Sequence, residues 1–235
     1  MSCRLYLIPT LLGDNDFNRS IPPYNLNLIN SINIFVVENE KSARKFIKTV
    51  LPEKPQSELE IHLLNKHTTD EELSELSKLF RRNEPLGILS EAGLPAVADP
   101  GARLVRLAHK NNIRVIPLVG ASSILLALMA SGMNGQEFSF HGYLPIDKAQ
   151  RKSAIQKLES ESRKSRSTRI FMETPYRNNQ LLDDLISFCQ PSTLLCVAAN
   201  ITMDDEIIMS KTIREWAQKK ADFHKKPAIF LLESF

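Results

Sequence analysis

Residues 86–101 have the sequence LGILSEAGLPAVADPG, and residues 114–123, RVIPLVGASS, show a similar pattern. Each stretch opens with a short aliphatic run typical of a buried strand and then turns to small residues, Gly and Pro. Four of the eight glycines fall between residues 86 and 120, and glycine is favoured where a backbone turns tightly or approaches a ligand. In open α/β sheets, ligands bind outside the carboxyl ends of the strands. The loops at residues 90–95 and 119–123 are therefore the expected walls of a binding site.

Outward from this stretch, strand-like runs alternate with helical patterns along the chain, which predicts βαβ units and a largely parallel sheet. No helical pattern separates the runs at 194–198 and 207–209, which predicts a mixed second sheet. We expect an α/β fold of two domains, residues 1–118 and 119–235. The expected strands are 4–8, 34–37, 60–63, 86–89, 114–118, 138–143, 169–172, 194–198, 207–209 and 228–232. The expected helices are 40–50, 70–82, 102–110, 122–131, 148–162, 176–189 and 212–219.

Composition excludes several classes of protein. Of the 235 residues, 43% are hydrophobic and 24% are charged, so the chain has enough apolar residues for a packed core. The net charge of +3 permits an anionic partner without demanding one. The longest apolar stretch, 115–129, is interrupted by Pro117 and Gly120, so we expect no membrane span. The three cysteines form no CxxC pair, which favours a reducing, cytoplasmic location.

Familiar cofactor motifs are absent. There is no GxGxxG after the first strand, no GxxxxGK[ST], no HExxH and no GxSxG. These absences disfavour NAD, ATP held by a P-loop, a zinc site and a serine nucleophile. The five histidines never pair at ligand spacing, so we expect no metal. The strand-end loops that remain offer main-chain groups at close range, which suits a ligand with a base, a ribose and a compact charged tail. Ser122 and Ser123 begin a helical pattern, either as an ordinary N-cap or as donors to a carboxylate.

Five motifs, in the right order along most of the chain, carry a family resemblance. They are YLIPT at 6–10, SEAGLPAVADPG at 90–101, RVIPLVGASS at 114–123, FSFHGYLP at 138–145 and IFMETPYR at 170–177. The motif that contains Asp99 is the most specific. Together they resemble the tetrapyrrole methylase superfamily, and most closely its small-subunit rRNA cytidine 2′-O-methyltransferase branch.

This resemblance implies a homodimer of two-domain chains that hold S-adenosylmethionine in a cleft between the domains. It implies a methyltransferase that acts in the cytoplasm on small-subunit rRNA. Carried over by position, the implied donor-binding residues are Leu12, Glu91, Ala92, Gly93, Ala96, Ser122, Ser123, Met172, Glu173, Ala198, Ala199, Pro227 and Ala228. Many of them would act through backbone atoms, which accounts for their small side chains.

The sequence departs from the family pattern in four places. Leu94 replaces a threonine usual after Ala-Gly. The usual Glu-Asp-Thr-Arg segment appears as Glu38-Asn39-Glu40-Lys41, so a carboxylate moves by one position. The usual Arg-Glu-Leu-Thr segment appears as Ala199-Asn200-Ile201-Thr202, so both of its charges are missing. The sequence ends at Phe235, where these rRNA enzymes usually carry a further segment, so we expect a short, divergent member.

Methyl transfer from a sulfonium needs little acid–base chemistry, because the donor is already activated and the protein chiefly positions the reactants. A ribose hydroxyl acceptor still benefits from a proton acceptor. Asp99 and Glu173 are the candidates for this catalytic role. The alternatives are a turn residue before Pro100 for Asp99 and an ion pair with Arg177 for Glu173.

Three functions stay open on these residues: an rRNA ribose 2′-O-methyltransferase, which we favour, a tetrapyrrole or corrinoid C-methyltransferase, and a non-catalytic module that binds S-adenosylmethionine. RNA binding needs basic surface. Two runs offer it, or else form solvated helix faces: Arg151, Lys152, Lys157, Arg163, Lys164, Arg166 and Arg169, and then Lys219, Lys220, Lys225 and Lys226.

Overall fold

The computed structural model describes residues 3–235 and divides them into two compact units, the first ending at Ser122 and the second spanning Ser123–Phe235. The first unit ends later than the expected residue 118, because the loop after its last strand stays packed on it. Asn25 donates a side-chain hydrogen bond to the carbonyl oxygen of Val119 at 2.8 Å. Gly120 lies so close to Pro9 that a Cβ atom on Gly120 would be 2.2 Å from the Pro9 Cβ.

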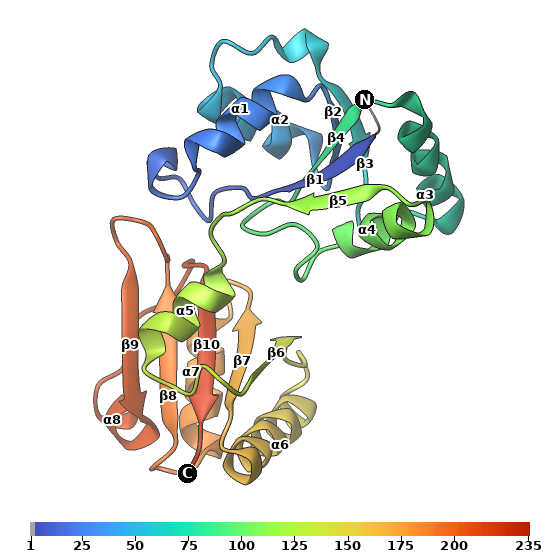
Figure 1. Cartoon of the computed structure of the whole chain (residues 1–235). Coiled ribbons are helices and arrows are strands. Elements are labelled where there is room, and N and C mark those ends of the chain that lie inside the picture. Colours follow the sequence, from blue (N-terminus) through green and yellow to red (C-terminus); the bar gives the residue numbers. More distant parts are fainter. Residues whose placement is uncertain (1–2) are drawn as a thin grey trace. The chain divides into compact units, whose positions relative to one another are not determined.

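The first unit is a five-stranded parallel sheet flanked by helices, as predicted (Figure 1). The strand order is β3-β2-β4-β1-β5. The strands are β1 (Arg4–Ile8), β2 (Ile34–Val37), β3 (Glu60–Leu63), β4 (Pro85–Leu89) and β5 (Arg114–Pro117). The helices are α1 (Pro23–Ser31), α2 (Glu40–Val50), α3 (Asp70–Leu76) and α4 (Gly101–Lys110), with short 3-10 helices at Phe17–Arg19, Gln56–Glu58 and Ser77–Arg82.

The connections after the neighbouring strands β1 and β4 cover opposite faces of this sheet. Ile29 of α1 packs in the same core as Phe35, on one face. Leu104 of α4 packs in the same core as Val36, on the other. The connections that leave the carboxyl ends of β1 and β4 therefore run to opposite faces of the sheet. The point between these two strands is a topological switch point, where open α/β sheets bind ligands.

Helix α2 shows how the sequence sets one wall of this edge. Its Asn39 cap accepts a hydrogen bond from the Ser42 N–H at 3.1 Å. Its buried residues, spaced at helical intervals, are Ala43, Phe46, Ile47 and Val50. Ser42, Lys45 and Thr49 consequently lie on its exposed side.

The second unit has a mixed five-stranded sheet in the order β6-β7-β10-β8-β9, which confirms the mixed sheet predicted from the missing helix (Figure 1). Within the described part of this second sheet, β6 and β7 pair in parallel and the other pairs are antiparallel. The strands are β6 (Phe138–Tyr143), β7 (Thr168–Glu173), β8 (Leu194–Ala199), β9 (Ile207–Thr212) and β10 (Ala228–Glu233). The helices are α5 (Ser123–Ser131), α6 (Lys148–Ser165), α7 (Asn178–Phe188) and α8 (Ile213–Gln218).

The core of the second unit lies between its sheet and helices α6, α7 and α8. Phe171 and Phe230 stack there with ring centroids 6.0 Å apart. The fully buried Trp216 donates its indole N–H to the Leu195 carbonyl oxygen at 2.9 Å. In residues 3–235 no helix is long and apolar enough to cross a membrane.

Candidate functional site

The loops that follow β1 and β4 are tied together by buried hydrogen bonds. The Thr10 N–H donates to the Gly93 carbonyl oxygen at 2.9 Å. The Ser90 hydroxyl donates to the same oxygen at 2.9 Å, and the Thr10 hydroxyl donates to the Ser90 carbonyl oxygen at 3.3 Å. Since both hydroxyl residues are buried, these bonds hold the two loops in one arrangement.

Gly93 lies where three loops meet. Its φ of +73° belongs to the left-handed region that side chains rarely adopt. A Cβ atom there would lie 3.0 Å from the Leu12 side chain and 3.3 Å from the Ala121 carbonyl oxygen. The loop after β5, which leads to Ser122, thus approaches the first loop and the β4 loop at a backbone that has no room for a side chain.

Asp99 holds the second half of the β4 loop. Its Oδ1 accepts hydrogen bonds from the Ala96 and Gly101 N–H groups, both at 2.7 Å. Ala96 and Ala98 have φ values of 66° and 59°, a strained conformation for alanine. The two bonds to Asp99 help to maintain it, so Asp99 acts as the turn residue that we gave as its alternative role.

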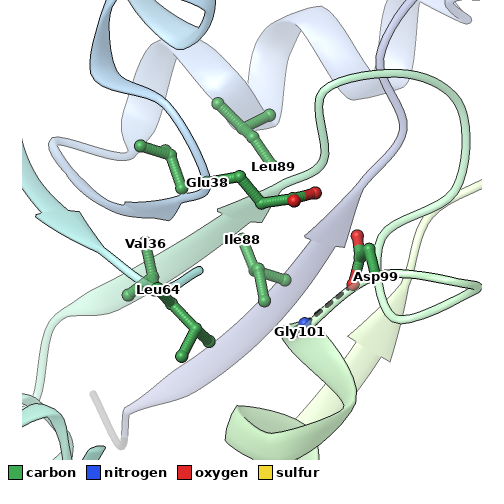
Figure 2. Close-up of a pocket in the computed structure, with 8 residues that line it drawn as sticks. Val36, Glu38, Leu64, Ile88, Leu89, Asp99 and Gly101 are labelled. Atoms are coloured by element: carbon green, nitrogen blue, oxygen red, sulfur yellow. Dashed lines mark hydrogen bonds between the residues drawn. The ribbon is translucent and has the colours of Figure 1, made fainter. Parts of the chain in front are cut away.

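A second carboxyl, Glu38, lies near Asp99 at the end of β2. Figure 2 shows both carboxyls at this edge of the sheet, beside Ile88 and Leu64. Burial raises the pKa of Glu38, and the charges of Asp99 and Glu91 raise it further. Burial also raises the pKa of Asp99, against the effect of its two backbone hydrogen bonds. The pKa values of both carboxyls at this edge of the sheet are therefore raised.

An open pocket of about 530 Å³ lies beside the first loop. The residues that line it come from the first loop, from α2 and from the β4 loop: Thr10, Leu11, Leu12, Gly13, Asp14, Asn15, Ser42, Lys45, Phe46, Thr49, Glu91 and Ala92. Leu12, Glu91 and Ala92 of the expected donor-binding set belong to this wall.

The expected residues of the second unit gather at one end of its sheet. Ala228 of β10 pairs with Glu173 of β7 on one side and with Ala199 of β8 on the other. In the next row Ile229 pairs with Met172 and Ala198. The Asn200 N–H donates to the Pro227 carbonyl oxygen at 2.9 Å. Six expected residues therefore lie in two adjacent rows of this sheet or directly beside them: Met172, Glu173, Ala198, Ala199, Pro227 and Ala228. The seventh, Ser123, is the first residue of α5.

Glu173 is buried and already partnered. Its Oε1 accepts hydrogen bonds from the Thr174 N–H and from the Arg177 guanidinium, both at 2.6 Å. The Glu173 side chain is 1% exposed, against 28% for Arg177. The ion pair that we gave as the alternative for Glu173 is present in the structure.

Sequence comparison identifies the family. The model of the family "Tetrapyrrole (Corrin/Porphyrin) Methylases" matches residues 4–217, which is most of the chain and spans both units. The chain belongs to the tetrapyrrole methylase family. Enzymes of this family transfer methyl groups from S-adenosylmethionine, so the fold, the enzyme class and the methyl donor expected from the motifs are confirmed at the level of the family.

Relatives of this tetrapyrrole methylase carry the name "Ribosomal RNA small subunit methyltransferase I". The protein from Micromonospora olivasterospora is 30% identical over 215 residues, which are 90% of this chain and 63% of that protein. The protein from Synechocystis sp. is 30% identical over 210 residues, covering 89% of this chain and 71% of that protein. The Haemophilus influenzae protein is 27% identical over 232 residues, covering 97% and 78%. The chain thus spans 63–78% of the length of these relatives.

The methyltransferase CobJ has a similar structure, with a TM-score of 0.62 over 99% of this chain and 93% of CobJ. The two sequences are 14% identical. At this identity the likeness shows the shared tetrapyrrole methylase fold alone.

The first unit of this tetrapyrrole methylase fits a compact nucleoside donor. Gly93 has no Cβ atom, which lets its backbone lie close to Leu12 and to the Ala121 carbonyl oxygen. Ala92 and Ala96, on the same loop, have the smallest side chains after glycine. Such loops present main-chain donors and acceptors at close range, and the exposed Glu91 adds a negative charge. These features suit a ribose and a positively charged sulfur.

The hypothesis of a basic RNA-binding run is wrong for Arg151. Its guanidinium is buried and donates to the Asp184 carboxylate at 2.7 Å, so it is not part of the surface. Lys220 and Lys226 of the second run form ion pairs with Asp183 and Asp205. Within residues 3–235 no group of three or more His, Cys, Asp or Glu residues is placed to hold a metal ion.

Sequence reasoning gave no role to several side chains that shape the site. The hydroxyls of Thr10 and Ser90 tie the loops together, and Glu38 shares the sheet edge with Asp99. Ser90 directly follows a predicted strand and Thr10 follows one after Pro9, and this position was the available signal. The sequence around Lys45 and Phe46 gave no such signal. A helix face becomes part of a pocket only when the helix packs beside other elements, and the sequence does not show that packing.

Proposed function

We propose that this protein transfers a methyl group from S-adenosylmethionine to a ribose 2′-hydroxyl of small-subunit ribosomal RNA. The observation that carries the proposal is the similarity, over 89–97% of the chain, to proteins named ribosomal RNA small subunit methyltransferase I. The likeness to CobJ supports the fold and gives no information about the substrate.

S-adenosylmethionine, when bound, supplies a methyl group activated by a positively charged sulfur. The residues of the first unit that would hold it are Leu12, Glu91, Ala92, Gly93, Ala96 and Ser122, and those of the second are Ser123, Met172, Glu173, Ala198, Ala199, Pro227 and Ala228. The transfer would form an O–CH₃ bond to the ribose and break the S–CH₃ bond, with S-adenosylhomocysteine as the leaving group and the hydroxyl proton passing to solvent. Orientation of the two reactants can supply about 7–11 kcal/mol of the barrier.

Asp99 and Glu173 serve this reaction as positioning residues. Asp99 accepts two main-chain N–H bonds within the β4 loop, and Glu173 accepts one at the end of β7. Each carboxylate fixes the backbone next to expected donor-binding residues, which supports positioning over proton abstraction for both.

The protein acts as a homodimer in the cytoplasm under this proposal. Ribosomal RNA is a cytoplasmic substrate in bacteria, and the buried free thiols of Cys3, Cys189 and Cys196 suit a reducing compartment. Light scattering of the purified chain tests the dimer, which predicts twice the monomer mass of 26.6 kDa.

The decisive experiment uses the purified chain, radiolabelled S-adenosylmethionine and small-subunit rRNA transcribed without modifications, alone and within reconstituted subunits. We expect label in RNA, in an alkali-resistant dinucleotide that marks a methylated ribose. Label transferred to a corrinoid or porphyrinoid precursor instead, or binding of S-adenosylhomocysteine without any transfer to RNA, would overturn the proposal.

A further inference from the structure

The open pocket of the first unit offers a site that the donor-binding motifs do not explain. Three elements form it: the first loop, the exposed side of α2 and the β4 loop. Four of its lining residues, Ser42, Lys45, Phe46 and Thr49, belong to α2. A volume of about 530 Å³ is within the range of small-molecule sites.

The side chains of the pocket have the chemistry of a nucleotide site. Leu11 and Phe46 line the pocket and provide its apolar surface. Phe46 as a whole residue is 8% exposed. Ser42 and Thr49 provide hydroxyls along the same side of α2. Lys45 provides an ammonium group. A base can pack on the apolar surface, a sugar can meet the hydroxyls, and a phosphate can meet the ammonium.

Lys45 can exchange its present partner for a phosphate. Its Nζ lies 3.1 Å from Asp14 Oδ1, with the two side chains 71% and 89% exposed. An ion pair so exposed contributes little, commonly below about 1 kcal/mol. An RNA phosphodiester, which carries one negative charge shared by two oxygens, competes for the same ammonium through charge-assisted hydrogen bonds.

The position of the pocket relates it to methyl transfer. Leu12, Glu91 and Ala92 line it and also belong to the expected donor-binding set. The acceptor oxygen must come within about 3–3.5 Å of the methyl carbon, so the acceptor has to bind next to the loops that hold the donor. The pocket meets this requirement within the first unit.

We propose that this pocket binds the nucleotide of RNA that accepts the methyl group, with its phosphate at Lys45 and its base against Leu11 and Phe46. The inference rests on the proposed function and names α2 as its substrate-binding element. Asp14 limits the affinity, because its carboxylate is a competitor of the phosphate for Lys45.

The first test compares Lys45→Ala with Lys48→Ala, an exposed lysine of the same helix outside the pocket. The measurements are the KM for the unmodified rRNA transcript and its dependence on salt. For Lys45→Ala we expect a KM at least about 10-fold higher and a salt slope smaller by about 0.7, the loss of one phosphate contact on a single strand. Lys48→Ala should leave both unchanged. Equal effects of the two variants would overturn the inference.

The second test fills the pocket with Thr49→Trp, against Lys48→Trp as the control. We expect Thr49→Trp to abolish methylation of the transcript while calorimetry shows normal binding of S-adenosylhomocysteine. Loss of S-adenosylhomocysteine binding would assign the pocket to the donor and overturn the inference. Full methylation by both variants would also overturn it while leaving the proposed function intact, whereas a wild-type chain that never methylates RNA refutes both.

Discussion

The two units present their expected binding residues in different ways. In the first unit these residues lie on loops beyond the ends of parallel strands, and a few side chains hold them: Thr10, Ser90 and Asp99. In the second unit most of them lie within the strands: Met172 and Glu173 in β7, Ala198 and Ala199 in β8, and Ala228 in β10. Antiparallel pairing of β10 with β7 and β8 places Ala228 between Glu173 and Ala199.

The two sets of expected binding residues are therefore held rigid by different interactions. A loop depends on a small number of acceptors, so one substitution can change its shape. A strand row is held by ladder hydrogen bonds that do not depend on side chains. We therefore expect substitutions in the β4 loop to affect ligand binding, and substitutions around Glu173 to affect stability.

The largest effect is expected for Arg177→Ala. It leaves the carboxylate of Glu173 buried without its cation, which typically costs about 3–5 kcal/mol; we expect the lower end, since Arg177 is partly exposed. The single tryptophan, Trp216, is buried in the second unit, so its fluorescence in urea reports the unfolding of that unit. The double variant Glu173→Gln/Arg177→Ala should recover most of the loss. Equal destabilisation in the single and double variants would show that the ion pair is not the cause.

The next effect concerns Gly93→Val in the loop of the first unit. A side chain there meets Leu12 and Ala121 and is strained at φ +73°. We expect the affinity for S-adenosylhomocysteine, measured by calorimetry, to fall at least about 100-fold. Gly132→Val is the matched control, because Gly132 has the same φ and nothing within 4 Å of its Cβ position. Unchanged affinity in Gly93→Val would remove Gly93 from the donor site.

Much of the fold was predictable because its strands are short aliphatic runs between clear turn signals. All ten predicted strands are present among residues 3–235, and the parallel and mixed sheets are as expected. Helix α1 was missed, since Asn25, Asn27 and Asn30 are poor helix formers. It forms because Ile29 is buried on the sheet, and tertiary packing overrides a weak local preference.

The candidate site was predictable where it depends on backbone and not where it depends on packing. Gly93 stands out in the sequence because only glycine tolerates its conformation without strain. The burial of Arg151 with Asp184, 33 residues away in the chain, has no local signal. For the same reason a lysine on α2 could not be assigned to a pocket before the helix was placed.

A smaller effect is expected for Asp99→Ala, which removes the one carboxylate oxygen that accepts both hydrogen bonds of the β4 loop. Leaving the Ala96 and Gly101 N–H groups without their partner costs about 1–3 kcal/mol for each group that stays buried. Water reaches this half-buried loop, so we expect about 2 kcal/mol in total, with weaker S-adenosylhomocysteine binding. Circular dichroism in urea measures the loss of stability, and calorimetry measures the affinity for S-adenosylhomocysteine. Asp16→Ala, which removes an exposed acceptor of the Asn18 N–H, should cost less; an equal cost would contradict the role given to Asp99.

The smallest effect is a gain of stability in Glu38→Gln. Burial raises the folded-state pKa of Glu38 above its usual 4.5, and the charges of Asp99 and Glu91 add to this. A carboxyl with a raised folded-state pKa contributes its full stability below the unfolded pKa and loses it as the pH rises through the folded pKa. At pH 7 the wild-type chain therefore bears the cost of the charge, and the glutamine variant does not.

We expect Glu38→Gln to be more stable than wild type at pH 7 by less than about 1 kcal/mol, because solvent screens a half-buried group. The advantage should shrink toward pH 4, and urea titrations at several pH values measure it. Glu53→Gln, at an exposed position after α2, removes the same charge and should show no such pH dependence. If both variants behave alike, the change reflects net charge rather than the crowded sheet edge. If Glu38→Gln alone gains stability, the first unit retains a charged group at its ligand edge at the expense of stability, in contrast to the second unit, where the buried carboxylate is neutralised by Arg177.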